Sequence, residues 1–249
     1  MPSEAELYLR GGGLAVAGAL AWLWYFDRKD RLRPEPRRRL AATFALGMAA
    51  TLLAFGTFRL LSHLGLPAGP GPVRSWALLY CVGLIGPIEE GAKFLFARGV
   101  CYRWKEFDEP VDGVIYGSTL ALGFAAAENL LYVPYLELTE QLARAVASPL
   151  THALFASIWG FGLARARLHA RTRRRRWLWQ IVPLLASMVL HGLYDFAVLS
   201  LGATLVASAL MLVLWVLTLG AIQRALADPR AQGPAAPERS PQGLTRDAA

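Results

Sequence analysis

The chain has 249 residues, of which 55% are hydrophobic, and it carries 26 Lys and Arg against 18 Asp and Glu. Its two cysteines and the lack of a Cys-x-x-Cys spacing argue against a disulfide scaffold and against a cysteine-rich metal domain. The charges lie in clusters separated by long apolar stretches, which indicates helices that cross a bilayer and leaves no room for a large soluble domain.

The apolar stretches predict seven transmembrane helices, at about 7–26, 40–63, 75–97, 111–134, 148–165, 177–200 and 203–223. The first is followed by basic residues, the reverse of a cleavable signal peptide, so we expect it to be retained. Residues 1–226 are then expected to form one transmembrane domain. Residues 227–249, rich in Ala, Pro, Gly, Gln and Arg, are predicted to be a disordered cytoplasmic tail.

The basic residues provide an independent test of these helices. Of the 26 Lys and Arg, 21 fall within 27–39, 98–109, 165–176 and the tail after 223. These segments are alternate loops, and cytoplasmic loops of membrane proteins are enriched in Lys and Arg. We therefore predict an all-α, polytopic membrane bundle with its N-terminus outside and its C-terminus in the cytoplasm. The excess of positive charge then reflects topology and not nucleic-acid binding.

Ionisable residues within the apolar stretches are the strongest functional indicators, because a charge in hydrocarbon costs from about 3 to more than 10 kcal/mol. The third helix carries the sequence Gly86-Pro87-Ile88-Glu89-Glu90-Gly91-Ala92-Lys93. Lys93 can reach either glutamate along a helix, but the two glutamates diverge by about 100° and must differ in role. Two carboxylates beside one lysine leave a negative charge that calls for a metal, a proton or a further cation.

The next three predicted helices each add such a residue. Glu128 has no Lys or Arg within four positions, so its partner must come from another helix. His152 begins the fifth helix, and His191 lies deep in the sixth with Asp195 four residues later on the same face. An aspartate in that position can orient a histidine ring. The alternatives are a protonated glutamate between helices and a self-contained His–Asp pair.

Several proteolytic chemistries are missing from this sequence. It contains no His-Glu-x-x-His and no Gly-x-Ser-x-Gly, and only one aspartate lies deep in a predicted helix. Two mechanisms remain. In one, Zn²⁺ is bound by three residues and Glu89 or Glu90 is the general base; the ligands are Glu128, His152 and His191. In the other, a glutamate activates water without a metal, and the histidines and Asn129 stabilise the oxyanion.

Either mechanism requires these groups to lie at one depth. By the predicted boundaries, Glu89 is nearer the cytoplasmic end of its helix, whereas Glu128 and His152 are nearer the outer end. A long, tilted or broken third helix would bring them level. Gly86-Pro87 is the expected position of such a break.

The ordered motifs resemble the PrsW family, which is related to the glutamate-dependent CAAX prenyl endopeptidases and the bacteriocin-immunity membrane proteins. They are Asp27-Arg28-Lys29-Asp30-Arg31, Pro34-Glu35-Pro36-Arg37, Glu89-Glu90-x-x-Lys93, Phe124-x-x-x-Glu128-Asn129, His152 and His191-x-x-x-Asp195. The resemblance implies an intramembrane peptidase of the bacterial inner membrane. Its implied substrate is a single-span, anti-sigma-factor-like protein, and its implied catalytic set is Glu89, Glu90, Lys93, Glu128, Asn129, His152, His191 and Asp195.

Two other functions are compatible with buried glutamates and histidines. A proton- or ion-coupled transporter uses such residues as well, but transporters often contain repeats, and none is found in this sequence. A membrane protein of the immunity type, without protease activity, would use the polar set for helix packing alone. The sequence does not predict an oligomeric state.

Overall fold

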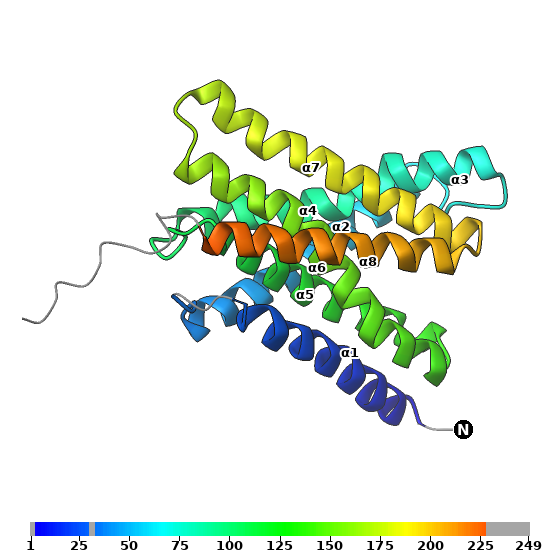
Figure 1. Cartoon of the computed structure of the whole chain (residues 1–249). Helices are drawn as coiled ribbons and strands as arrows, with labels where there is room; N and C mark the ends of the chain where they lie inside the picture. The colour runs from blue at the N-terminus through cyan, green and yellow to red at the C-terminus, as the bar shows by residue number, and fades with distance from the viewer. Residues whose placement is uncertain (1–2, 30–32, 228–249) are drawn as a thin grey trace, which may run out of the picture.

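The computed structural model describes residues 3–29 and 33–227, and every regular element in them is helical (Figure 1). The elements are α1 (Glu4–Asp27), α2 (Arg37–His63), α3 (Arg74–Tyr80), η1 (Cys81–Ile85), α4 (Gly86–Gly99), η2 (Cys101–Arg103), α5 (Asp112–Tyr132), η3 (Val133–Tyr135), α6 (Leu138–Leu168), α7 (Arg173–Asp195), η4 (Phe196–Ser200) and α8 (Thr204–Leu226). The segments η1 and η4 are π-helical, and η2 and η3 are 3₁₀ turns. Apart from Ala227, the predicted disordered tail lies outside the described residues.

Five helices in the described part of the chain are long and apolar enough to cross a membrane. They are α2, α5 with η3, α6, α7 with η4, and α8. The prediction of an all-α, multi-pass membrane protein is therefore confirmed. The number seven and the orientation of the termini stay predictions, because α1 and the interrupted α3–α4 segment are not among the five.

Helix α5 lies at the centre of the bundle and packs against α1, α2, α4 and α6. In its most apolar stretch, 78% of the residues are buried. Glycines bring its backbone against its neighbours: a Cβ at Gly47 of α2 would lie 1.9 Å from the Leu120 carbonyl oxygen, and one at Gly113 would lie 2.0 Å from that of Gly160 in α6. Small residues at crossings allow this approach, as is common between membrane helices.

The third helix does not stop at the predicted break: it stays helical from Arg74 to Gly99, and a π-helical segment makes it irregular there. The π-helical segment η1 ends at Ile85, immediately before Gly86-Pro87. Next to it, α4 and α7 are in backbone contact, because a Cβ at Gly86 would lie 2.1 Å from the Met188 carbonyl oxygen. On α7, a Cβ at Gly192 would lie 2.4 Å from the Cys81 oxygen. The π-helical segment η1 and the close contacts at Gly86 and Gly192 place the start of α4 beside His191.

Helix α6 begins ten residues before the predicted span at 148 and contains 31 residues. Its start is capped by Glu137, whose backbone N–H donates to the Glu140 carboxylate at 2.9 Å. The stretch Thr139-Glu140-Gln141-Leu142-Ala143-Arg144 is too polar for hydropathy to indicate a membrane helix. The extension matters because it carries Arg144 toward the site.

The glycine contacts lead to a prediction about stability. Gly47→Ala places a methyl group against the α5 backbone and should lower the free energy of unfolding by about 1–3 kcal/mol. Gly56→Ala is the matched control on the same helix, since nothing lies within 4 Å of a Cβ there. Thermal unfolding in detergent measures both. A Gly47→Ala protein that unfolds at or above the wild-type midpoint would contradict the contact.

Candidate active site

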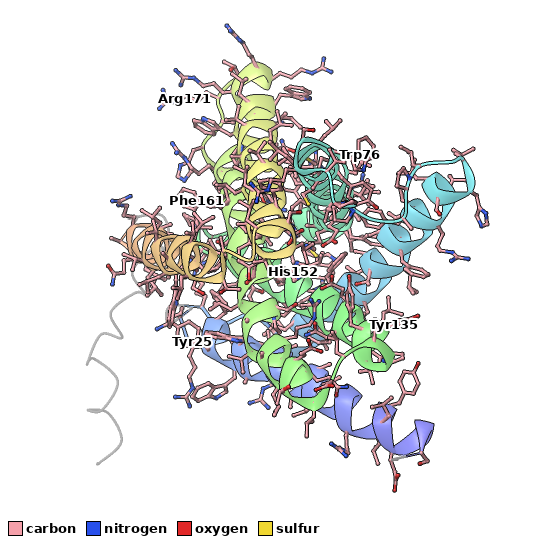
Figure 2. The ribbon with its side chains drawn as sticks, turned by 90° about the vertical axis from the view of Figure 1, so that its right-hand side faces the viewer. Tyr25, Trp76, Tyr135, His152, Phe161 and Arg171 are labelled. Atoms are coloured by element: carbon pink, nitrogen blue, oxygen red, sulfur yellow. The ribbon has the colours of Figure 1, made fainter. Side chains whose placement is uncertain are left out.

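Side chains from four helices converge in the middle of the bundle, where Figure 2 places His152. Helix α4 supplies two glutamates and a lysine, α5 one glutamate, α6 one histidine, and α7 a histidine and an aspartate. They are the predicted residues Glu89, Glu90, Lys93, Glu128, His152, His191 and Asp195. Their roles are distinguished by how many partners each side chain has.

The carboxylate of Glu90 is fully buried and has no capacity left for further hydrogen bonds. Its Oε1 accepts from Lys93 Nζ at 2.7 Å and lies 2.9 Å from His191 Nδ1. Its Oε2 accepts from Trp159 Nε1 at 2.8 Å and from Ser187 Oγ at 3.2 Å, and Ser187 shares its one proton with the Phe155 carbonyl oxygen at 2.9 Å. Four donors from three helices surround one carboxylate, so Glu90 anchors these helices to one another.

The carboxylate of Glu89 is in the opposite situation. Its Oε2 lies 3.7 Å from Lys93 Nζ, 3.8 Å from His191 Nε2 and 4.0 Å from His152 Nδ1. This buried atom has no hydrogen-bond partner among the described residues. One donor atom each from Glu89, His152 and His191 lies within 4.8 Å of the others. A carboxylate and two imidazoles in this arrangement are a suitable ligand set for a metal ion.

The remaining ring nitrogens support the same interpretation. His191 Nδ1 is held by Glu90, and His152 Nε2 lies 3.1 Å from Glu128 Oε2. Carboxylates commonly hold the second nitrogen of a metal-binding histidine in this way. The nitrogens that face Glu89 are His191 Nε2 and His152 Nδ1, although Lys93 Nζ also lies 2.8 Å from His152 Nδ1. The geometry thus offers a set in which Glu89 stands in place of the predicted Glu128, whose Oε2 is bonded to His152 and Arg144.

Lys93 lies close to this set. Its Nζ is 2.8 Å from His152 Nδ1 and 4.1 Å from the centre of the Phe124 ring. The ammonium group is therefore a fixed positive charge beside Glu89. It also occupies one side of His152 Nδ1, so Lys93 would have to release this nitrogen for it to bind a metal.

Arg144 is the partner that Glu128 requires, and sequence analysis placed it outside the helices. Its Nη2 donates to Glu128 Oε2 at 3.1 Å, and its Nε donates to Asn129 Oδ1 at 3.1 Å. Asn129 Nδ2 in turn donates to the Arg144 carbonyl oxygen at 3.3 Å. Asn129, predicted to stabilise an oxyanion, is thus turned toward Arg144 and positions it.

Two further residues were missed although helical spacing could have found them. Ser187 lies four residues before His191, and Trp159 lies seven after His152, so each shares a face with a predicted site residue. Asp195 Oδ2 lies 3.5 Å from His191 Nε2, beside the ring as expected but beyond normal hydrogen-bond length.

The segment around Pro34-Glu35-Pro36-Arg37 lies elsewhere. Glu35 accepts a hydrogen bond from the Tyr116 hydroxyl, and Arg33 Nε lies 2.8 Å from Glu109. These contacts tie the start of α2 to the start of α5, far along that helix from Glu128. Asp30 and Arg31, from the other motif of this region, lie outside the described residues.

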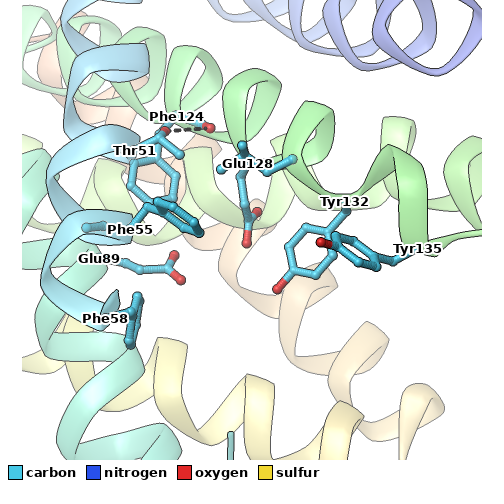
Figure 3. A pocket seen from close by; sticks show the side chains of 10 residues that line it. Thr51, Phe55, Phe58, Glu89, Phe124, Glu128, Tyr132 and Tyr135 are labelled. Carbon is cyan, nitrogen blue, oxygen red and sulfur yellow. Dashed lines mark hydrogen bonds between the residues drawn. The ribbon is translucent and has the colours of Figure 1, made fainter. Parts of the chain in front are cut away.

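Two cavities reach the convergent residues from different sides. The α2–α5 cleft has a volume of about 220 Å³ and is lined mainly by aromatic side chains (Figure 3). The α6–α8 cavity has a volume of about 330 Å³ and includes His152, His191 and Asp195 in its wall. Glu89 and Glu128 line both. The two carboxylates therefore stand between an apolar and a more polar space.

Glu90 is surrounded by hydrogen-bond donors, whereas Glu89 Oε2 has none in the described part of the chain. The two adjacent glutamates should therefore respond differently to substitution. Glu90→Gln should destabilise the protein by about 3–5 kcal/mol, because it leaves Lys93 without its closest charge and turns an amide donor toward other donors. Glu89→Gln should change stability much less. Thermal unfolding of the two purified variants measures the difference; equal losses would contradict the assignment of Glu90 as the anchor.

Comparison with known proteins places these residues in a family context. The family described as "PrsW family intramembrane metalloprotease" matches residues 35–220. A protein named Protease PrsW from Oceanobacillus iheyensis is 30% identical over 84% of this chain and 93% of its own length. Those from Geobacillus kaustophilus and Bacillus subtilis are 33% and 31% identical over 74% and 75% of this chain, and over 78% and 81% of their own lengths. No solved structure matches the chain significantly.

Proposed function

This chain belongs to the PrsW family of intramembrane metalloproteases, and on that premise we propose that Glu89, His152 and His191 hold a catalytic zinc ion. The unpartnered, buried Glu89 Oε2 between two imidazoles carries this proposal. Zinc at such a site supplies a polarised water whose pKa falls to about 7. The ligand set is a proposal of the geometry, since the family description specifies a metal but not its ligands.

Glu128 is the proton acceptor in this proposal. It lies outside the three-residue set, yet it lines both cavities and is fixed by Arg144 and His152. As water oxygen attacks the carbonyl carbon of the scissile peptide, Glu128 takes the proton. It then gives the proton to the amide nitrogen as the carbon–nitrogen bond breaks. Glu90 holds the His191 ring in place during these steps.

The proposed substrate is a single-span membrane protein of the bacterial inner membrane, similar to an anti-sigma factor. The sequence-derived topology puts the ends of α2 and α5 that flank the cleft on the outer side. Cleavage would then occur in the outer half of the bilayer and would release the extracytoplasmic part of the substrate. Protease function, which the family and its named relatives support, leaves the transporter and the non-catalytic alternatives without a favouring observation.

Two variants distinguish the proposed role of Glu89 as a metal ligand from the proposed role of Glu128 as the proton acceptor. Glu89→Gln should lose both bound zinc and cleavage of a co-expressed single-span reporter. Glu128→Gln should retain zinc while cleavage falls by about 10²–10⁴-fold. Immunoblotting of the reporter and metal analysis of the purified proteins provide the two readouts. Wild-type cleavage by either variant would overturn the corresponding role.

Metal analysis of the wild type beside His152→Ala tests the requirement for zinc itself. We expect about one zinc ion per wild-type chain and loss of it in His152→Ala. A chelator should stop cleavage, and added zinc should restore it. An active wild-type protein without bound metal would instead support direct activation of water by Glu89, with Lys93 as the neighbouring positive charge.

A further inference from the structure

The α2–α5 cleft follows directly from how α2 and α5 cross. The two helices are in backbone contact at Gly47 and Gly123, and Thr51 Oγ1 donates to the Phe124 carbonyl oxygen at 3.0 Å just beyond. After this hydrogen bond the cleft begins, between Phe55 and Phe58 of α2 and the end of α5. The helices are thus pinned together at one end of the cleft and separated along it.

The walls of this cleft face the outside of the bundle. Phe55 is 49% exposed and Tyr132 is 42% exposed, although both line the cavity. Tyr132 is additionally held by Arg144, whose guanidinium lies 4.3 Å from the centre of its ring. In a bilayer these aromatic walls meet lipid, so the cleft is open sideways to a molecule that moves within the membrane.

The floor of the cleft is acidic. Figure 3 shows the carboxylates of Glu89 and Glu128 pointing into the space between the aromatic side chains. An empty apolar groove could be filled by lipid alone, but two carboxylates at its floor are unfavourable for an acyl chain. They suit a chain that brings peptide groups with it, because peptide N–H groups donate hydrogen bonds.

The α6–α8 cavity meets the same two carboxylates from the other side. It brings the charged side chains of Arg144 and Asp195 to them and is the more polar of the two spaces. Water therefore has a polar route to Glu89 and Glu128 that does not pass through the aromatic cleft. An apolar ligand in the α2–α5 cleft and water in the α6–α8 cavity are therefore kept apart. The two spaces meet at the carboxylates of Glu89 and Glu128.

Resting on the proposed protease function, we propose that the α2–α5 cleft binds the scissile segment of the substrate, in extended form, with an apolar side chain against Phe55 and Phe58. The α6–α8 cavity supplies the water. In a helix the peptide N–H groups are already bonded to carbonyl oxygens four residues earlier, so only an unwound segment offers free N–H donors to Glu89 and Glu128 at the floor of the cleft. A transmembrane substrate therefore unwinds locally before it reaches Glu89.

The first test narrows the cleft. Phe55→Trp should lower cleavage of the single-span reporter at least tenfold, and Phe55→Ala should shift the preference at the cleaved bond toward larger side chains. Leu53→Trp is the control: Leu53 is on the same helix and 42% exposed, but it does not line the cleft. Wild-type cleavage and unchanged preference in both Phe55 variants would overturn the proposal.

The second test does not depend on catalysis. A cysteine at Phe58 should form a disulfide with cysteines scanned through the membrane segment of the reporter, in an otherwise wild-type and in a Glu89→Gln background. Leu53→Cys is the matched control, and the native Cys81 and Cys101 are buried and can remain. Cross-linking at Leu53 equal to that at Phe58, or none at Phe58, would show that the cleft holds lipid.

The two tests keep the proposals distinguishable. If the wild type cleaves no reporter while Phe58→Cys still cross-links, the cleft is a peptide site and the proposed chemistry is wrong. If the wild type cleaves and neither Phe55 variant differs from it, the chemistry stands and the substrate approaches from elsewhere.

Discussion

The carboxylate of Glu90 is the interaction on which the rest of the site depends. It is buried without exposure and joins α4, α6 and α7 through Lys93, Trp159, Ser187 and His191. A single unpaired carboxylate in this position would be prohibitively costly, whereas four donors satisfy it. By fixing Lys93 and His191, Glu90 determines which atoms are left to face Glu89.

Adjacent residues with opposite environments follow from helix geometry. Because Glu89 and Glu90 differ by about 100° around α4, only one can face the small-residue contact with α7 and the core of the bundle. Glu90 takes that side and is saturated. Glu89 faces two cavities and keeps one oxygen without a hydrogen bond. The Glu90 carboxylate therefore holds the helices together, and the Glu89 carboxylate is available to a ligand.

Sequence reasoning predicted the helical membrane fold and the convergence of Glu89, Glu128, His152 and His191, because ionisable residues stand out against apolar stretches. It expected an irregularity at Gly86-Pro87, where the helix is continuous but π-helical up to Ile85. It did not distinguish Glu89 from Glu90, since that depends on donors from α6 and α7. Arg144 was missed because hydropathy cannot extend a membrane helix through a polar stretch. The contact between Arg144 and Asn129 was therefore missed as well. The predicted ligand set of Glu128, His152 and His191 stays a prediction beside the alternative set in which Glu89 replaces Glu128.

X-ray absorption at the zinc edge of the purified protein reports the atoms bound to the ion, and so it can detect Glu89 as a ligand. We expect two imidazole nitrogens and a carboxylate oxygen as protein ligands, with loss of the carboxylate contribution in Glu89→Gln but not in Glu128→Gln. A spectrum unaffected by Glu89→Gln, or zinc bound through sulfur, would contradict a metal centre built on Glu89.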